Sequence, residues 1–164
     1  MFANRFVFAI CLLAAALLAG CGKSADKKKA AVAPSEYGVF ISSLDCADSG
    51  KLKMEECSKV IDAAIALHNK ETTVYKFLQK CEAGEGGPDR CDKTGEDEYR
   101  AKLQAFYVTF STPPAAIPLY PPKTAAVAFR TQAKQVIDAK DTSLRISNDA
   151  MALAYENKKL QLAK

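Results

Sequence analysis

The sequence KMEECSKVIDAAIALHNK at residues 53–70 carries the strongest structural signal in the chain. Apolar and small side chains recur along it at helical spacing, from Met54 through Cys57 and Ile61 to His68. Such a stripe is typical of an amphipathic helix that turns one face to a core. We therefore predict a helix from about Lys53 to Lys70, with Cys57 facing inward.

A second helix is predicted immediately after the first. It would start at residues 71–73, because Val74, Phe77 and Cys81 then share one helical face. The two helices would form a hairpin. Glycines and a proline at residues 83–89 end the second helix and return the chain to Cys91.

The start of the chain has the pattern of an export signal. Arg5 precedes an apolar run from Phe6 to Leu18, and Leu-Ala-Gly-Cys closes it at Cys21. This resembles the lipobox of bacterial lipoproteins, as opposed to an ordinary signal peptide or an uncleaved anchor. The resemblance implies cleavage before Cys21 and lipidation of that residue. Gly22 after the cysteine implies the outer membrane.

The segment after the lipobox is predicted to be a flexible basic tether, at residues 21–35. It holds several lysines and almost no large apolar side chains, so it cannot form a core. Lysines close to an anionic membrane surface add about 1 kcal/mol of attraction each. From Glu36 onward, 18 basic and 18 acidic residues cancel, and this balance argues against a nucleic-acid partner.

Four cysteines remain in the exported part: Cys46, Cys57, Cys81 and Cys91. An even number of thiols in an exported small domain predicts disulfides, although four cysteines allow three pairings. Pairing sequence neighbours, 46 with 57 and 81 with 91, has the lowest entropy cost of loop closure. The sequence has no C-x-x-C motif, which argues against a redox pair. It has a single histidine, which argues against a zinc site.

The rest of the chain has the features of strands. Tyr37–Ile41 and residues 103–110 are rich in aromatic and β-branched residues. Ala116–Tyr120 lies between prolines, which favours an edge strand. Val127–Ile137 and Ser143–Ser147 are predicted to form a hairpin, with helix as the open alternative across Ala126–Met151. A short final helix is expected after Asn148.

The predicted fold class is α+β, a disulfide-stapled helical hairpin packed with a small antiparallel sheet from the C-terminal half. Four parts are expected along the chain. They are a signal peptide at 1–20, the lipidated cysteine and tether at 21–35, one domain at 36–155 and a frayed tail at 156–164.

A family resemblance covers most of residues 36–151. The elements are S-L-D-C, E-E-C and K-C-E around the cysteines, followed by L-Q-A-F-Y-V, P-L-Y and F-R-T. This order is similar to the YgiB-like family of uncharacterised bacterial envelope proteins. The resemblance implies an envelope location, no established reaction and no catalytic residue.

Three groups of side chains are candidate functional sites. His68, the single histidine, is predicted to pack in the domain, because no nucleophile elbow accompanies it. The acidic segment from Glu82 to Glu98 is predicted to be a solvated loop and not a metal site, since its spacing is not that of an EF-hand. Aromatic side chains on strands are typical of a core, and the lining of a peptide groove is the alternative for four of them: Phe106, Tyr107, Phe110 and Tyr120.

The functional prediction is a membrane-anchored binding or scaffold module of the cell envelope. It would need no cofactor or metal, and its partners would be the membrane and an envelope protein. The alternative is an envelope enzyme that acts on peptidoglycan or lipid through dispersed residues.

Overall fold

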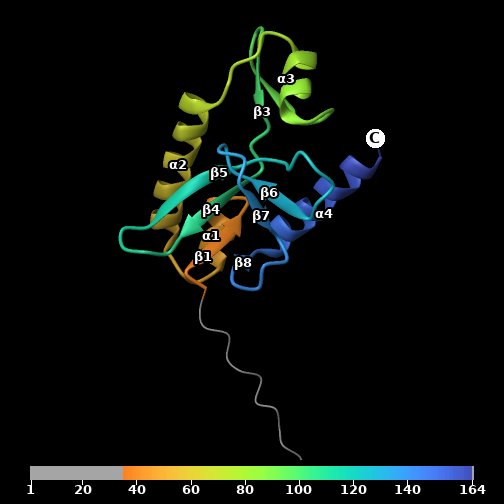
Figure 1. The fold of residues 1–164 in the computed structure, drawn as a ribbon. Helices are drawn as coiled ribbons and strands as arrows, with labels where there is room; N and C mark the ends of the chain where they lie inside the picture. The colour runs from red at the N-terminus through yellow and green to blue at the C-terminus, as the bar shows by residue number, and fades with distance from the viewer. Residues whose placement is uncertain (1–34, 164) are drawn as a thin grey trace, which may run out of the picture. The chain divides into compact units, whose positions relative to one another are not determined.

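The computed structural model describes residues 35–163 (Figure 1). The predicted signal peptide, Cys21 and the tether up to residue 34 lie outside this range. No helix in the part of the chain that is described combines the length and hydrophobicity needed to cross a bilayer.

The main sheet has four strands: β1 (Tyr37–Phe40), β4 (Ala105–Thr109), β5 (Ala115–Leu119) and β8 (Arg145–Ile146). Their order is β5-β4-β1-β8. The β1–β4 and β4–β5 pairs are antiparallel, whereas β1 and β8 are parallel. The three predicted strands at these positions are confirmed, and the proline-bounded β5 is an edge strand as expected.

Two helices follow β1 and pack against each other: α1 (Ser43–Asp48) and α2 (Met54–Glu71). The Ser42 hydroxyl oxygen caps α1 by accepting a hydrogen bond from the backbone N–H of Asp45 at 3.1 Å. Gly50 then turns the chain with a φ of 69°, which favours glycine. The predicted disulfide between Cys46 and Cys57 joins the two helices.

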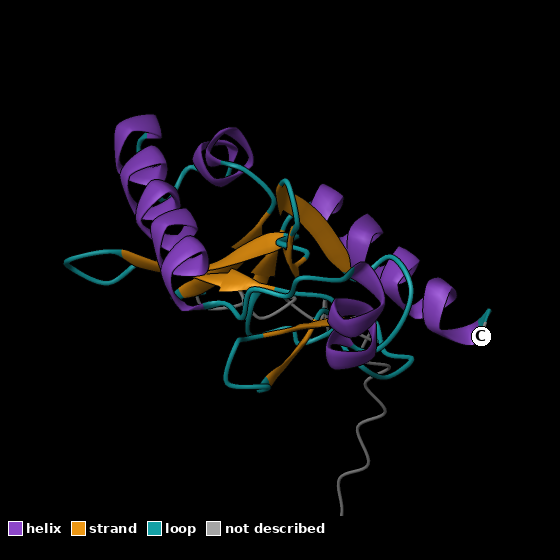
Figure 2. Cartoon of the chain, turned by 90° about the horizontal axis from the view of Figure 1, so that it is seen from above, coloured by secondary structure: helices purple, strands orange, loops and turns teal. Residues whose placement is uncertain are grey.

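Helices cover both faces of the main sheet, and the domain is α+β as predicted. Helix α2 contacts β4 and β5, and α4 (Asn148–Leu162) contacts β1 and β6 (Ala128–Arg130). Figure 2 shows α2 and α4 on opposite sides of the sheet. The helix pair joined by the first disulfide is therefore α1 with α2. The sequence instead predicts a hairpin of α2 with the helix that follows it.

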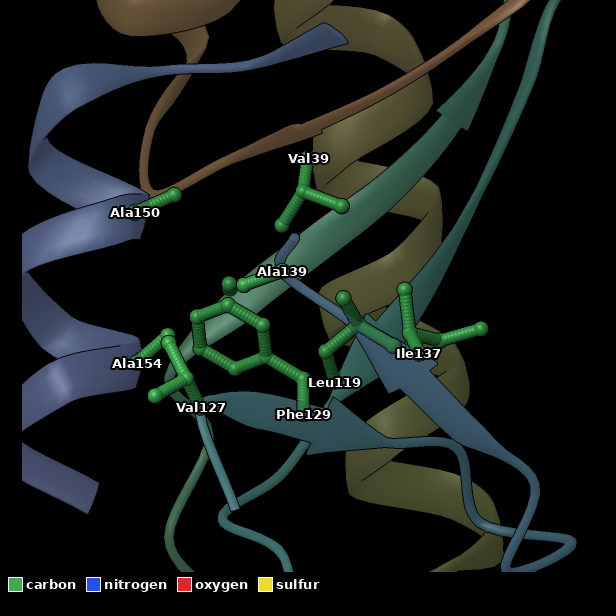
Figure 3. Close-up of a cluster of buried hydrophobic side chains, with 9 residues drawn as sticks. Val39, Leu119, Val127, Phe129, Ile137, Ala139, Ala150 and Ala154 are labelled. Carbon is green, nitrogen blue, oxygen red and sulfur yellow. The ribbon is translucent and has the colours of Figure 1, made fainter. Parts of the chain in front are cut away.

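Two apolar clusters hold these layers together. Alternation along the strands sends Val39 to one face and Phe40 to the other. The first cluster packs Ala150 and Ala154 of α4 against Val39 and Phe129 (Figure 3). Small alanines let the helix backbone approach closely, and each large side chain that is fully buried contributes about 1.5–3 kcal/mol.

The second cluster lies under α1 and α2, on the other face of the sheet. It includes both sulfurs of the first disulfide, because Cys46 and Cys57 are fully buried. Val60 and Ile61 of α2 pack there against Phe106 of β4. The amphipathic stripe predicted for α2 therefore faces the sheet.

Helix α3 (Leu78–Glu85) begins later than predicted. The chain before it is extended, because Tyr75 exchanges two backbone hydrogen bonds of 2.9 Å with Tyr99. Val74 and Phe77, expected on a buried helical face, are 39% and 65% exposed. A non-local strand pairing overrides the local helical spacing here.

The acidic segment from Glu82 to Glu98 is not the predicted loop: it runs from the end of α3 through a turn into a hairpin. Strands β2 (Cys91–Gly95) and β3 (Glu98–Ala101) pair antiparallel. The second predicted disulfide, Cys81–Cys91, ties α3 to the start of β2.

The predicted hairpin of Val127–Ile137 with Ser143–Ser147 is wrong in its pairing. The first segment folds back on itself, so that β6 pairs with β7 (Val136–Asp138). Lys134 makes this turn in a left-handed conformation with a φ of 68°. The second segment supplies β8, which pairs with β1. The extended structure expected at both ends of this stretch is confirmed. The helix left open as an alternative does not form between residues 126 and 147, and α4 begins only at Asn148.

Helix α4 extends well into the predicted frayed tail at 156–164. The Ser147 hydroxyl caps its start by accepting from the N–H of Ala150 at 3.1 Å, and the helix continues to Leu162. Asn157, inside the predicted tail, is fully buried. Polar burial on this helix was not visible in the hydrophobic pattern.

Candidate functional site

A polar pocket of about 350 Å³ opens between α3, the end of β5 and the β6–β7 turn. Five separate segments of the chain build it, so no short motif in the sequence marks it. We call it the Arg130 pocket, after the arginine in its inner wall. It is lined by Thr72, Thr73, Tyr75, Gly84, Glu85, Ala101, Tyr120, Lys123, Arg130, Gln132 and Lys134.

An ion pair between Arg130 and Glu85 forms the inner wall of the pocket. Their side chains are only 8% and 13% exposed, and Nη2 of Arg130 contacts Oε2 of Glu85. Nε of Arg130 donates to the carbonyl oxygen of Pro121 at 2.9 Å. Because water is largely excluded, this pair is screened far less than a surface pair. It fixes α3 to β6.

Tyr75 extends this contact to the other oxygen of the same carboxylate. Its hydroxyl donates to Oε1 of Glu85 at 3.1 Å. Burial and the adjacent Glu85 carboxylate raise the pKa of Tyr75, so the phenol stays protonated. Gly84 permits the approach, because a Cβ at that position would lie 2.6 Å from the Tyr75 hydroxyl oxygen.

Tyr120 lines the pocket, and His68 supports it from the buried side. The Tyr120 hydroxyl lies 3.1 Å from Nδ1 of His68, and both residues are buried. Burial raises the pKa of Tyr120 to about 12, although the Arg130 guanidinium, 5.2 Å from the ring centre, opposes this. Burial also lowers the pKa of His68, and Arg100 adds to the effect. Both groups are therefore neutral near pH 7.

The rim of the pocket is cationic. Lys123 donates from Nζ to the carbonyl oxygen of Gly84, and Lys134 stands exposed at the β6–β7 turn. Gln132 donates from Nε2 to the carbonyl oxygen of Glu71 at 2.6 Å. Counting Arg130, the lining has three cations against the single Glu85 carboxylate. The arrangement suits an anionic ligand.

No family model, curated protein or solved structure matches this chain. The resemblance to the YgiB-like family therefore stays an expectation from the sequence.

Two other hollows are larger than the Arg130 pocket, and contacts in one of them give its Asp45 a structural role. One, of about 410 Å³, is lined by Asp45, Asp48 and Asp149 among others. Oδ2 of Asp45 accepts from the N–H of Ile41 at 2.9 Å and from the Ser147 hydroxyl at 2.6 Å, so it joins β1 to α4. The other, of about 500 Å³, surrounds the exposed start of β1.

A second buried polar cluster lies outside the Arg130 pocket. Nη1 of Arg90 donates to Oδ1 of Asn157 at 3.1 Å, and Nε2 of Gln104 donates to the same oxygen at 3.0 Å. Nε of Arg90 is buried with no partner among the described residues. This cluster fastens α4 to the segment before β2.

The predicted site residues have different outcomes. The four disulfide cysteines pair as predicted, whereas Cys21 lies outside the described residues. The four aromatic side chains do not share a groove. Phe106 and Tyr120 are buried, and Tyr107 and Phe110 pack against opposite clusters. Strand alternation separates residues 106 and 107, so the groove alternative is wrong and these side chains pack against the cores.

His68 is buried and hydrogen-bonded, as predicted. Among the described residues, no group of three acidic, histidine or cysteine side chains is placed to hold a metal ion. Sequence reasoning missed Glu85, Lys134 and Arg130. The available signal was F-R-T, residues 129–131, because an arginine between two strand-forming residues is unusual unless it has a buried partner.

Proposed function

We propose that this chain is a lipid-anchored protein of the bacterial envelope and that its domain is a binding module. The apolar leader that closes on Leu-Ala-Gly-Cys supports the anchor at Cys21. Two disulfides support an oxidising compartment, where such bonds persist. The resemblance to YgiB-like envelope proteins adds to both arguments.

The Arg130 pocket carries the binding part of the proposal. Its inner groups are locked by hydrogen bonds before any ligand enters, which lowers the entropy cost of binding. The phenol of Tyr120 and the imidazole of His68 are neutral and bonded to each other. The pocket therefore offers donors and charge at fixed positions, as a recognition site requires.

The anchor is tested by membrane fractionation of the full-length protein and its Cys21→Ser variant. Wild-type protein should remain in the outer-membrane fraction, and the variant should lose lipid and leave it. Equal membrane association of both proteins would contradict the anchor.

The binding role is tested by photocrosslinking in intact cells. A photoreactive residue in place of Gln132, at the pocket rim, should form a defined adduct with an envelope component. The same residue in place of Lys59, on the exposed side of α2, is the control and should not. Absence of a specific adduct at 132 would contradict the binding role.

A further inference from the structure

We propose that the Arg130 pocket binds the carboxylate group of a small acidic ligand. This inference rests on the proposed binding role, but it is independent of the lipid anchor. The carboxylate could belong to a free organic acid or to the C-terminus of a short peptide, and the two sources are separated by the experiment below.

The charges that line the pocket favour an anionic ligand. Arg130 and Glu85 neutralise each other, which leaves the positive charges of Lys123 and Lys134 facing the pocket without a carboxylate partner among the described residues. A pocket with low-dielectric walls concentrates the field of such charges. An anion that enters is therefore favoured over a neutral molecule of the same shape.

The hydrogen bonds of Arg130 hold two of its three nitrogens. The guanidinium of Arg130 is held by Glu85 and Pro121 through Nη2 and Nε. Its third nitrogen, Nη1, donates to no described residue. A guanidinium fixed in this way presents a free, charged N–H₂ group, and charge-assisted hydrogen bonds to carboxylates are about twice as strong as neutral ones.

The Glu85 carboxylate limits the charge of the ligand. It lies beside Arg130, so it repels a phosphate dianion more strongly than a monoanionic carboxylate. The size of the pocket limits the ligand further, because about 350 Å³ is at the lower end for small-molecule sites. Hydroxyl groups of Thr73 and Tyr75 line the remaining wall and suit the polar body of such a ligand.

The test is an NMR titration of the full chain, extracted from membranes in detergent. The probes are lactate, which is a monoanionic free acid, acetyl-alanyl-alanine and the C-terminal amide of that dipeptide, with inorganic phosphate as a further arm. We expect saturable shifts at Arg130 and its neighbours with at least one carboxylate and none with the amide. Binding of lactate alone indicates a free acid, and preference for the dipeptide indicates a peptide terminus.

Lys134→Asn is the test variant, because asparagine tolerates the left-handed backbone and the change removes the charge. It should weaken carboxylate binding about fivefold. Lys59→Asn, an exposed lysine outside the pocket, is the matched control and should bind like the wild type.

Three results would overturn the inference: equal binding of the amide, binding of phosphate without either carboxylate, or unchanged affinity in Lys134→Asn. Absence of any probe binding would also overturn it. If position 132 still crosslinks to an envelope component in that case, the proposed binding role stands and only the ligand class fails.

Discussion

Nδ1 of His68 lies 3.1 Å from the hydroxyl oxygen of Tyr120, a residue 52 positions later in the chain. The contact joins the last turns of α2 to the residue after β5. It is buried, and both partners are neutral near pH 7 because burial moves their pKa values in opposite directions. His68 thus supports Tyr120, whose ring lies under the Arg130 guanidinium.

The lowered pKa of His68 predicts a stability loss in mild acid. The unfolded chain takes up the proton at its ordinary pKa of 6.5, whereas the folded protein resists protonation to a lower pH. The contribution is therefore complete above pH 6.5 and declines as the pH falls toward the folded value. Urea unfolding from pH 8 to 5 should show this slope in the wild type. His68→Gln, which cannot titrate, should cost about 1 kcal/mol at pH 8 and show a shallower slope; an identical slope would contradict the assignment.

Glu85→Gln should destabilise the domain by about 3 kcal/mol, because it leaves Arg130 as an uncompensated buried cation. Urea unfolding measures the difference. The control is Glu98→Gln, which breaks the exposed pair with Lys76, whose side chains are 42% and 67% exposed. That change should cost less than about 1 kcal/mol. Similar costs for both variants would mean that the buried pair contributes no more than a surface one.

Removal of the second disulfide should loosen α3. The variant Cys81→Ala with Cys91→Ala opens a loop with a sequence separation of 10, and chain entropy predicts a loss of about 3 kcal/mol. Urea unfolding gives the loss, and proteolysis should cut first near α3. The equivalent double alanine variant at Cys46 and Cys57 is the comparison. Cleavage near α1 in both variants would argue that α3 is held by other contacts.

Lys134→Gly should stabilise the protein by about 1 kcal/mol, since glycine adopts a φ of 68° without steric cost. Ala133→Gly, the adjacent change at an ordinary φ, should instead destabilise it by about 0.5–1 kcal/mol. Thermal or urea unfolding of both variants gives the signs. Destabilisation by Lys134→Gly would contradict the left-handed turn.

Local patterns accounted for the elements whose neighbours in space are also neighbours in sequence. Helix α2 followed from its apolar stripe, and both disulfides followed from short closure distances. Strand β5 could be placed at an edge because proline cannot donate a backbone hydrogen bond. These features depend on residues within about one helix or one turn of each other.

Long-range pairing decided the remainder. Tyr75 pairs with Tyr99, and this contact keeps residues 72–77 extended despite their helical spacing. The Arg130 pocket could not be predicted for the same reason. Arg130 and Glu85 are 45 residues apart, and each appears in the sequence as an isolated charge. Only the F-R-T element hinted that this arginine has a structural partner.

Intact-mass measurement of the full-length protein, extracted from membranes without reductant, tests the central proposal most directly. The account predicts a chain that begins at Cys21, carries three acyl chains and gains the hydrogens of two disulfides on reduction. A chain that begins at Met1 or after another cleavage site, without lipid and with free thiols, would contradict it.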